Sequence, residues 1–197
     1  TLLIDQGVGS WLLLGAIVTT MDLEPHQGEQ PDPCGTCTRC IDACPTAAIT
    51  PWEVDASKCI SYLTIEHRSE IDPAYFSSMG HWIFGCDICQ EVCPHNQPTD
   101  RSAAAPVHEE YEERFRTLNV LEVLGWDDQA RQDAFRGSSM KRAKLNMIRR
   151  NAVIVAGNIL AQNSNPALEH KLKEIQRDAE EDPIVRATAE AVLHAHC

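Results

Sequence analysis

Two similar cysteine motifs constrain the fold of this chain more than any other feature. Residues 34–45 read CGTCTRCIDACP, and residues 83–94 read IFGCDICQEVCP. The first has the spacing C-x2-C-x2-C-x3-C-P, and the second repeats it except that Ile83 stands opposite Cys34. Three thiolates at this tight spacing wrap one cuboidal iron-sulfur cluster, and the fourth, followed by proline, ligates the other cluster of a two-cluster ferredoxin. The motifs therefore predict two 4Fe-4S clusters that relay single electrons.

This arrangement assigns seven of the eight ligands that two such clusters need. The predicted ligands of cluster one are Cys34, Cys37, Cys40 and Cys93. Those of cluster two are Cys44, Cys86, Cys89 and one further cysteine. Two candidates remain for that place, Cys59 between the motifs and Cys197 at the end of the chain. We favour Cys59, because a chain terminus on a helix end is prone to fray.

The nine cysteines could also form disulfides or bind zinc. Disulfides require a secretory context, and the N-terminus has neither a basic start nor a small-residue cleavage site. The apolar run at residues 11–18 is too short to span a membrane, so we expect a cytoplasmic protein without membrane contact. Two zinc sites of four cysteines stay open as an alternative, but zinc sites usually pair two C-x2-C knuckles, which this spacing fits poorly.

The chain divides into three predicted parts. Residues 1–22 form the first part, in which two short apolar segments around glycines at 1–20 are typical of one or two buried strands. Residues 23–100 hold eight of the nine cysteines and predict a ferredoxin-like domain organised by its clusters. After a linker at 98–106, residues 107–197 have helical patterning and predict an all-α domain. The expected fold class is therefore α+β.

The helical part contains a hint of a repeat. Residues 148–160 align with residues 185–197 at a period near that of HEAT-type helical repeats. Two copies are weak support, and an ordinary helical bundle remains the alternative.

The charge of the chain is unevenly spread. The net charge is −12, and residues 1–100 carry 3 Lys and Arg against 14 Asp and Glu. The first half repels polyanions, so any nucleic-acid contact should come from the second half. Five of the 17 Lys and Arg lie within ten residues, namely Lys141, Arg142, Lys144, Arg149 and Arg150. Such clustering suits phosphate contacts, although a charged run on a helix is more often a solvated face.

Four stretches together resemble the epoxyqueuosine reductase family. They are CGTCTRCIDACPTAAI, CISYLTIEHR, GHWIFGCDICQEVCPHN and RGSSMKRAKLNMIRRNAVIVAGN, in the order and spacing of that family. The resemblance implies a cytoplasmic enzyme that reduces epoxyqueuosine to queuosine at the wobble position of tRNA, the last step of queuosine biosynthesis. It implies cobalamin and two 4Fe-4S clusters as cofactors, an external electron donor such as a flavodoxin or ferredoxin, and tRNA as substrate. We expect a monomer.

The resemblance also bears on individual residues. The family has an N-terminal cobalamin domain with a proton-donating Asp, and residues 1–22 would be its remnant. We therefore assign the catalytic acid to no residue of this chain, and we expect the chain to be inactive alone. Ser61, Asp87 and Ile88 are predicted cobalamin contacts, because they adjoin ligands of cluster two. The five basic residues of 141–150 are predicted tRNA contacts.

Two rival functions and several minor expectations remain. One rival is a reductive dehalogenase-like corrinoid enzyme, and the other is a two-cluster electron-transfer protein without catalysis of its own. His67, His81 and His95 are expected to pack or face solvent rather than bind metal. Trp82 and Phe84 are expected to cover a cluster and keep it dry.

Overall fold

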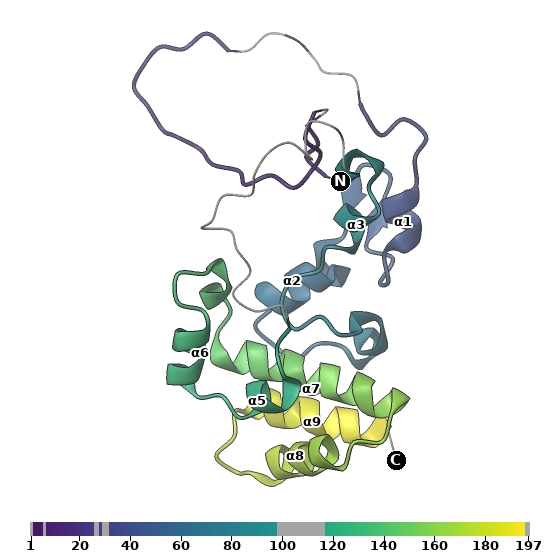
Figure 1. Cartoon of the computed structure of the whole chain (residues 1–197), viewed down its shortest axis with the longest axis vertical. Coiled ribbons are helices and arrows are strands. Elements are labelled where there is room, and N and C mark those ends of the chain that lie inside the picture. Colours follow the sequence, from purple (N-terminus) through teal and green to yellow (C-terminus); the bar gives the residue numbers. More distant parts are fainter. Residues whose placement is uncertain (1, 6, 26–27, 29–31, 98–116, 196–197) are drawn as a thin grey trace.

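The structure is a computed structural model that describes residues 2–5, 7–25, 28, 32–97 and 117–195. It has a cluster half, residues 32–97, and a helical half, residues 117–195, which lie one above the other in Figure 1. The predicted linker at 98–106, the first residues of the predicted helical domain and Cys197 lie outside the described residues.

Short elements make up the cluster half. The α-helices are α1 (Arg39–Ala43), α2 (Ile60–Ile65) and α3 (Ile88–Glu91). The strands β1 (Ile49–Thr50) and β2 (Glu53–Val54) form an antiparallel pair, with Ile49 opposite Val54. The 3-10 turns are η1 (Ala56–Lys58), η2 (Pro73–Tyr75), η3 (Ser77–Met79) and η4 (Pro94–Asn96). Elements this short bury little apolar surface, as expected of a fold organised by a bound group.

The helical half has the helices that its sequence pattern predicts. They are α5 (Val120–Leu124), α6 (Asp128–Ala134), α7 (Leu145–Gln162), α8 (Pro166–Arg177) and α9 (Pro183–Ala195), with the 3-10 turn η6 (Ser139–Arg142) before α7. Side chains of Asn119, Asp127 and Asn165 cap α5, α6 and α8 by accepting from backbone N–H groups inside each helix. Such caps satisfy donors that the first turn of a helix leaves unpaired.

Helix α7 lies between the two halves (Figure 1). Its residues Ile148, Ala152 and Val155 belong to the main core, which they share with α5, α8 and α9. Ile154 instead joins a smaller core with Ile60 of α2 and Met79. A helix with apolar residues on most of its circumference must be buried on several sides, and α7 meets that need by packing against both halves.

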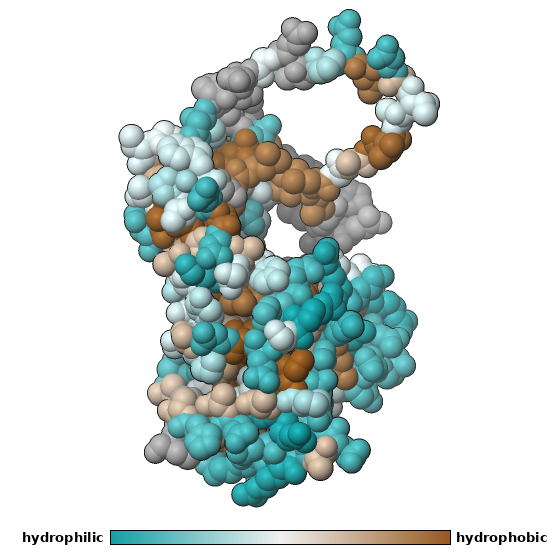
Figure 2. Space-filling model, turned by 180° about the vertical axis from the view of Figure 1, so that it is seen from behind, coloured by the Kyte–Doolittle hydropathy of each residue, from teal (hydrophilic) through white to brown (hydrophobic). Residues whose placement is uncertain are grey.

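The prediction of one or two buried strands in residues 1–20 is wrong for the described residues. The segment shows one isolated bridge, between Asp5 and Gly9. Leu13, Ile17 and Val18 are 82%, 92% and 100% exposed, and apolar side chains of this segment stand out in Figure 2. A strand needs a neighbour to pair with, and the described residues offer this apolar run none beyond that bridge.

Candidate metal centre

Each of the two predicted sets of cysteines lines one cavity, and Cys34, Cys37 and Cys40 of the first set also line a further cavity. Cavity one, about 50 Å³, is lined by the thiols of Cys34, Cys37, Cys40 and Cys93. Cavity two, about 280 Å³, is lined by the thiols of Cys44, Cys59, Cys86 and Cys89. Cys59 thus lies with Cys44 of the first motif and with Cys86 and Cys89 of the second, although it belongs to neither motif.

The local fold explains how each motif curls around its cavity. The backbone N–H of Cys37 donates to the carbonyl of Cys34 at 2.9 Å, which closes a turn. The last cysteine of that motif, Cys44, follows α1 and leaves it in an extended conformation. The second motif does the same, since Cys93 follows α3 in an extended conformation. An extended residue before proline is the expected geometry, and it carries each final cysteine away from its own motif.

The two cavities are neighbours. Leu2 lines both of them, and helices α1 and α3 pack against each other. The charge of a Cys40 thiolate would raise the pKa of both Cys34 in its own set and Cys89 in the other. Two bound clusters would therefore lie side by side, as a relay for single electrons requires.

Two thiols of cavity two, those of Cys86 and Cys89, resist ionisation. Burial first, and then the neighbouring thiols of Cys86 and Cys59, raise the pKa of Cys89 to about 11. Burial is also the main cause of the raised pKa of Cys86. A metal ion reverses this balance, because a coordinating thiol is deprotonated outright. The raised pKa of Cys86 and Cys89, in a cavity lined by four cysteines, therefore fits a site for a cationic iron cluster.

Cys44 is the exception in this set. Burial raises its pKa, but hydrogen bonds from Ala48 and Thr46 outweigh burial and lower the pKa below its ordinary value. The backbone N–H of Ala48 donates to Cys44 Sγ at 3.3 Å. Hydrogen bonds to a ligating sulfur are one of the means by which a protein tunes the potential of a cluster.

The extreme N-terminus covers both cavities, a feature that the sequence did not reveal. Leu2 and Ile4 line cavity one. Ser10 anchors this segment, because its N–H donates to Asn96 Oδ1 at 2.6 Å and its hydroxyl donates to Gln90 Oε1 at 3.1 Å. The alternation of Leu2 and Ile4 was a signal for a buried face, but the sequence alone did not say that a cluster loop would be its partner.

The predicted cobalamin contacts border cavity two. Ser61, Asp87 and Ile88 are half-buried and line the same cavity as Cys59, Cys86 and Cys89. The Asp87 carboxylate accepts a hydrogen bond from Gln90 Nε2 at 3.0 Å, which holds it near the motif. A group docked beside cluster two could reach all three side chains.

The five basic residues do not form one surface. Lys141 and Lys144 are exposed, and Arg142 is paired with Glu66 at 2.6 Å. Arg149 forms a two-point pair with Glu181, in which both guanidinium–carboxylate distances are 2.9 Å or less. Arg150 is fully buried, so its inclusion among tRNA-contacting residues is wrong, because a phosphate cannot reach its guanidinium.

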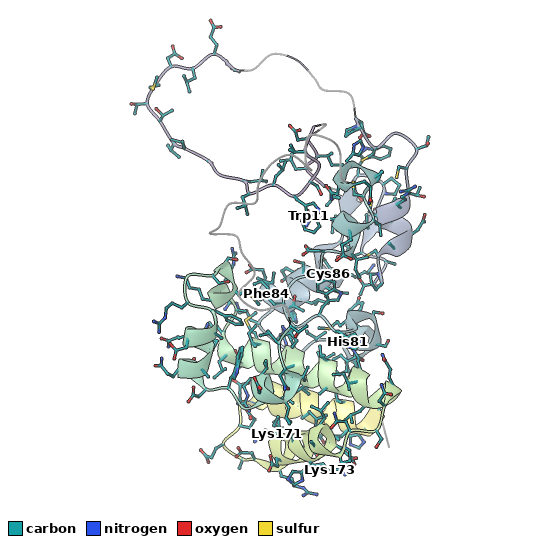
Figure 3. The ribbon with its side chains drawn as sticks, in the orientation of Figure 1. Trp11, His81, Phe84, Cys86, Lys171 and Lys173 are labelled. Carbon is teal, nitrogen blue, oxygen red and sulfur yellow. The ribbon has the colours of Figure 1, made fainter. Side chains whose placement is uncertain are left out.

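Of the other side chains singled out by the sequence, His95 borders cavity one, whereas His67, Trp82 and Phe84 line neither cavity. His67 Nε2 contacts the carbonyl of Glu70 at 2.9 Å, and His95 Nε2 contacts the carbonyl of Pro33 at 3.0 Å. Trp82 and Phe84 line neither cavity and instead pack against the two cores. Figure 3 shows Phe84 and Cys86 near the junction of the two halves. Trp82 shares the smaller core with Cys86, and Phe84 packs against the main core.

Comparison with known proteins agrees with the geometry of the two cavities. Residues 33–96 match the 4Fe-4S double cluster binding domain family. An epoxyqueuosine reductase from Synechocystis is 46% identical over 158 residues, which cover 76% of this chain and 52% of that protein. One from Leadbetterella byssophila is 43% identical over 156 residues, 78% of this chain and 49% of that protein. The chain is homologous to the epoxyqueuosine reductases.

Solved epoxyqueuosine reductases share the fold. The selenomethionine-labelled enzyme superposes with a TM-score of 0.83 and 27% identity, over 95% of this chain and 48% of that one. The Bacillus subtilis enzyme gives a TM-score of 0.75 and 26% identity over the same shares. A third structure, solved with an epoxyqueuosine-modified tRNA-Tyr stem loop, gives 0.66 and 27% over 86% of this chain and 43% of that one. The chain spans about half the length of the epoxyqueuosine reductases that it matches.

In the described part of the chain, no helix is both long and apolar enough to cross a membrane. Nor are three or more Cys, His, Asp or Glu side chains grouped there around a single metal ion. A cuboidal cluster instead takes its cysteines at four separate irons.

Proposed function

We propose that this chain is the cluster-bearing part of an epoxyqueuosine reductase, which reduces epoxyqueuosine in tRNA to queuosine. The observation that supports this most directly is the sorting of the eight described cysteines into two neighbouring cavities, in a chain homologous to that family over both halves. Cytoplasmic location, a monomeric state and an external electron donor belong to the same proposal.

The ligand sets follow from the cavities. Cys34, Cys37, Cys40 and Cys93 would hold cluster one, and Cys44, Cys59, Cys86 and Cys89 would hold cluster two. When bound, the clusters supply a path for single electrons. The cysteine thiols deprotonate to bind iron, and Leu2 and Ile4 exclude water from cavity one.

Cobalamin would supply the chemistry at the epoxide, and the border of cavity two is where this chain would meet it. Ser61 offers a hydroxyl, Ile88 an apolar contact and Asp87 a carboxylate already oriented by Gln90. The cobalamin domain of the family, with its catalytic acid, would be supplied by the half of the relatives that this chain does not cover. We also propose that α7, α8 and α9 form a HEAT-like unit, because α9 packs against both α7 and α8, as the helices of stacked repeats do.

We propose three domains: residues 1–22 as the remnant of the cobalamin domain, 23–100 as the two-cluster domain and 107–197 as the helical domain. The exposed apolar side chains of residues 11–23 support the first boundary, because a folded partner would cover them.

Metal content tests the proposal first. The protein would be purified anaerobically with cobalamin supplied, and iron, sulfide, zinc and cobalt counted per chain. We expect about eight irons and no zinc, with cobalt bound once the rest of the family's length is present. That complete form should convert epoxyqueuosine in tRNA to queuosine.

Each other result has a clear meaning. Eight irons in a complete form that binds no cobalt would indicate an electron carrier. Two zincs without iron would contradict the ligand sets, and with them the function.

A further inference from the structure

We propose that Arg150 and Asn151 of α7 are positioning residues that fix Cys59 relative to Cys86, so that both can ligate cluster two. The inference rests on the ligand sets proposed above. It gives α7, which carries no ligand of its own, a part in building the metal centre.

Cys59 depends on distant support. The other ligand candidates lie in compact motifs whose turns bring neighbouring cysteines together, as the hydrogen bond from Cys37 N to Cys34 O does. Cys59 instead stands alone as the N-cap residue of α2. It is separated by 27 positions from Cys86, the next cysteine in its set, so the intervening chain must be held in place by something else.

Arg150 holds the far end of α2. The N–H of Leu63 donates to the carbonyl of Cys59 at 2.9 Å, and Arg150 Nη2 donates to the carbonyl of Leu63 at 2.7 Å. Arg150 Nη1 donates to the carbonyls of His67 at 2.9 Å and Ser69 at 2.6 Å. A guanidinium that binds the last carbonyls of a helix both satisfies and orients them. Cys59 is therefore one helical turn from a group fixed by α7.

Asn151 ties α2 to the segment that leads into Cys86. Its Nδ2 donates to the carbonyl of Thr64 at 2.9 Å and to that of Ile83 at 2.8 Å. The N–H of Gly85 in turn donates to Thr64 Oγ1 at 3.0 Å. Gly85 directly precedes Cys86, so this single amide and one hydroxyl connect the helix that begins at Cys59 with the backbone that ends at Cys86.

The two residues act as a unit. Asn151 Oδ1 accepts from Arg150 Nε at 3.1 Å and from Nη2 at 2.9 Å. Both side chains are fully buried. Burying a cation is expensive unless its donors are paired, and every acceptor named here is a neutral oxygen. Such a network fixes the positions of its members, because moving one acceptor away leaves a buried donor unpaired.

Asn158 provides a matched control on the same helix. Its Nδ2 donates to the carbonyls of Phe76 at 2.7 Å and Gly80 at 2.8 Å. These bonds have the same chemistry and also join α7 to the cluster half. They end on residues that adjoin neither Cys59 nor Cys86, so they support the fold without orienting a ligand.

The test compares Asn151→Ala, Arg150→Lys and Arg150→Met with Asn158→Ala in the anaerobically reconstituted chain. The measurements are iron and sulfide per chain, the electron paramagnetic resonance spectrum and midpoint potential of each reduced cluster, and the midpoint of thermal unfolding. We expect Asn151→Ala and Arg150→Met to lose about half of the iron, with the signal of cluster one retained. Arg150→Lys, which keeps the charge but not the fork of donors, should retain more iron and shift the signal of cluster two alone.

Asn158→Ala should lower the unfolding temperature yet keep both signals. The positioning role is overturned if Asn151→Ala keeps full iron and an unchanged cluster-two signal, or if Asn151→Ala and Asn158→Ala lose iron equally. The same series separates this inference from the proposed function. A wild-type chain that binds no iron contradicts the function and the inference together, whereas a wild-type chain with both clusters and unaffected variants contradicts the inference alone.

Discussion

At the scale of single residues, Cys59 decides whether cluster two is complete. It lines cavity two with Cys44, Cys86 and Cys89, and its charge would raise the pKa of both Cys86 and Cys89. The sequence left Cys197 as the other candidate, and that residue lies outside the described part of the chain. Cys59 and Cys197 therefore make a discriminating pair of substitutions.

We expect Cys59→Ser to lower iron from about eight to about four per chain, because a cluster with three thiolates is easily lost. Cys197→Ser serves as the control and should leave iron unchanged. Iron and sulfide analysis of the reconstituted proteins measures both. The reverse result, with iron lost only in Cys197→Ser, would move the eighth ligand to the chain terminus.

Gly9 is a second position at which a single added atom would disturb the structure. Its φ is +85°, and an added Cβ would overlap Asn96 Oδ1 and lie 2.6 Å from the carbonyl oxygen of His95. We expect Gly9→Ala to cost at least about 1 kcal/mol, since left-handed backbone alone costs that much for other residues. The cost should appear as faster hydrogen exchange in residues 2–10.

Gly15→Ala is the matched control for that substitution, because an added Cβ at Gly15 meets nothing within 4 Å. Equal exchange in the two variants would show that residues 2–10 do not pack against η4 as the structure describes. A faster exchange in Gly9→Ala only would support the cover over cavity one.

At the scale of elements, α8 contributes to stability rather than to the metal centre. Leu172 is fully buried and belongs to the main core with α7 and α9. We expect Leu172→Ala to lower the free energy of unfolding by about 2–5 kcal/mol, the usual cost of a cavity in a core. Denaturant unfolding measures it, and the iron content of the folded protein should not change.

Leu121 offers a comparison in the same half, because its side chain on α5 is 40% exposed. Leu121→Ala should cost under about 1 kcal/mol, since exposed positions contribute little. A similar loss in the two variants would mean that α8 does not share the core with α7 and α9. A loss of iron in Leu172→Ala would instead show that the core is coupled to the clusters.

At the scale of the whole molecule, charge separates the two halves. The cluster half is strongly acidic, whereas the helical half exposes Lys141 and Lys144 just before the start of α7. Arg149 is engaged by Glu181, and Arg150 is buried. The proposed contact with tRNA therefore depends on fewer residues than the sequence run suggests.

We expect the double substitution Lys141→Glu and Lys144→Glu to weaken tRNA binding and to reduce the slope of affinity against salt by about 2, one for each lost phosphate contact. Binding titrations at several salt concentrations measure it. The control reverses the charges of Lys171 and Lys173 on α8, which pair with Glu174 and Glu169 and lie near the bottom of the view in Figure 3. An equal loss in both proteins would indicate net charge alone, and unchanged affinity in the first would contradict the contact.

The sequence by itself determined the features that depend on local spacing. Cysteine spacing divided seven thiols into the two sets that line the two cavities, and the apolar periodicity of residues 144–160 predicted α7. Both are short-range patterns, in which the residues that act together also lie together along the chain. The residues that match a double cluster binding domain, 33–96, include both cysteine motifs.

Only the tertiary structure decided the partners of residues whose contacts are distant in sequence. Arg149 and Arg150 are neighbours of the same type, yet one pairs with Glu181 and the other binds carbonyls of residues 63–69. Apolar character alone predicted strands in residues 1–20, but a strand also needs a neighbour to pair with. The physical reason is common to both cases: burial and pairing depend on which surfaces meet, and spacing along the chain does not encode that.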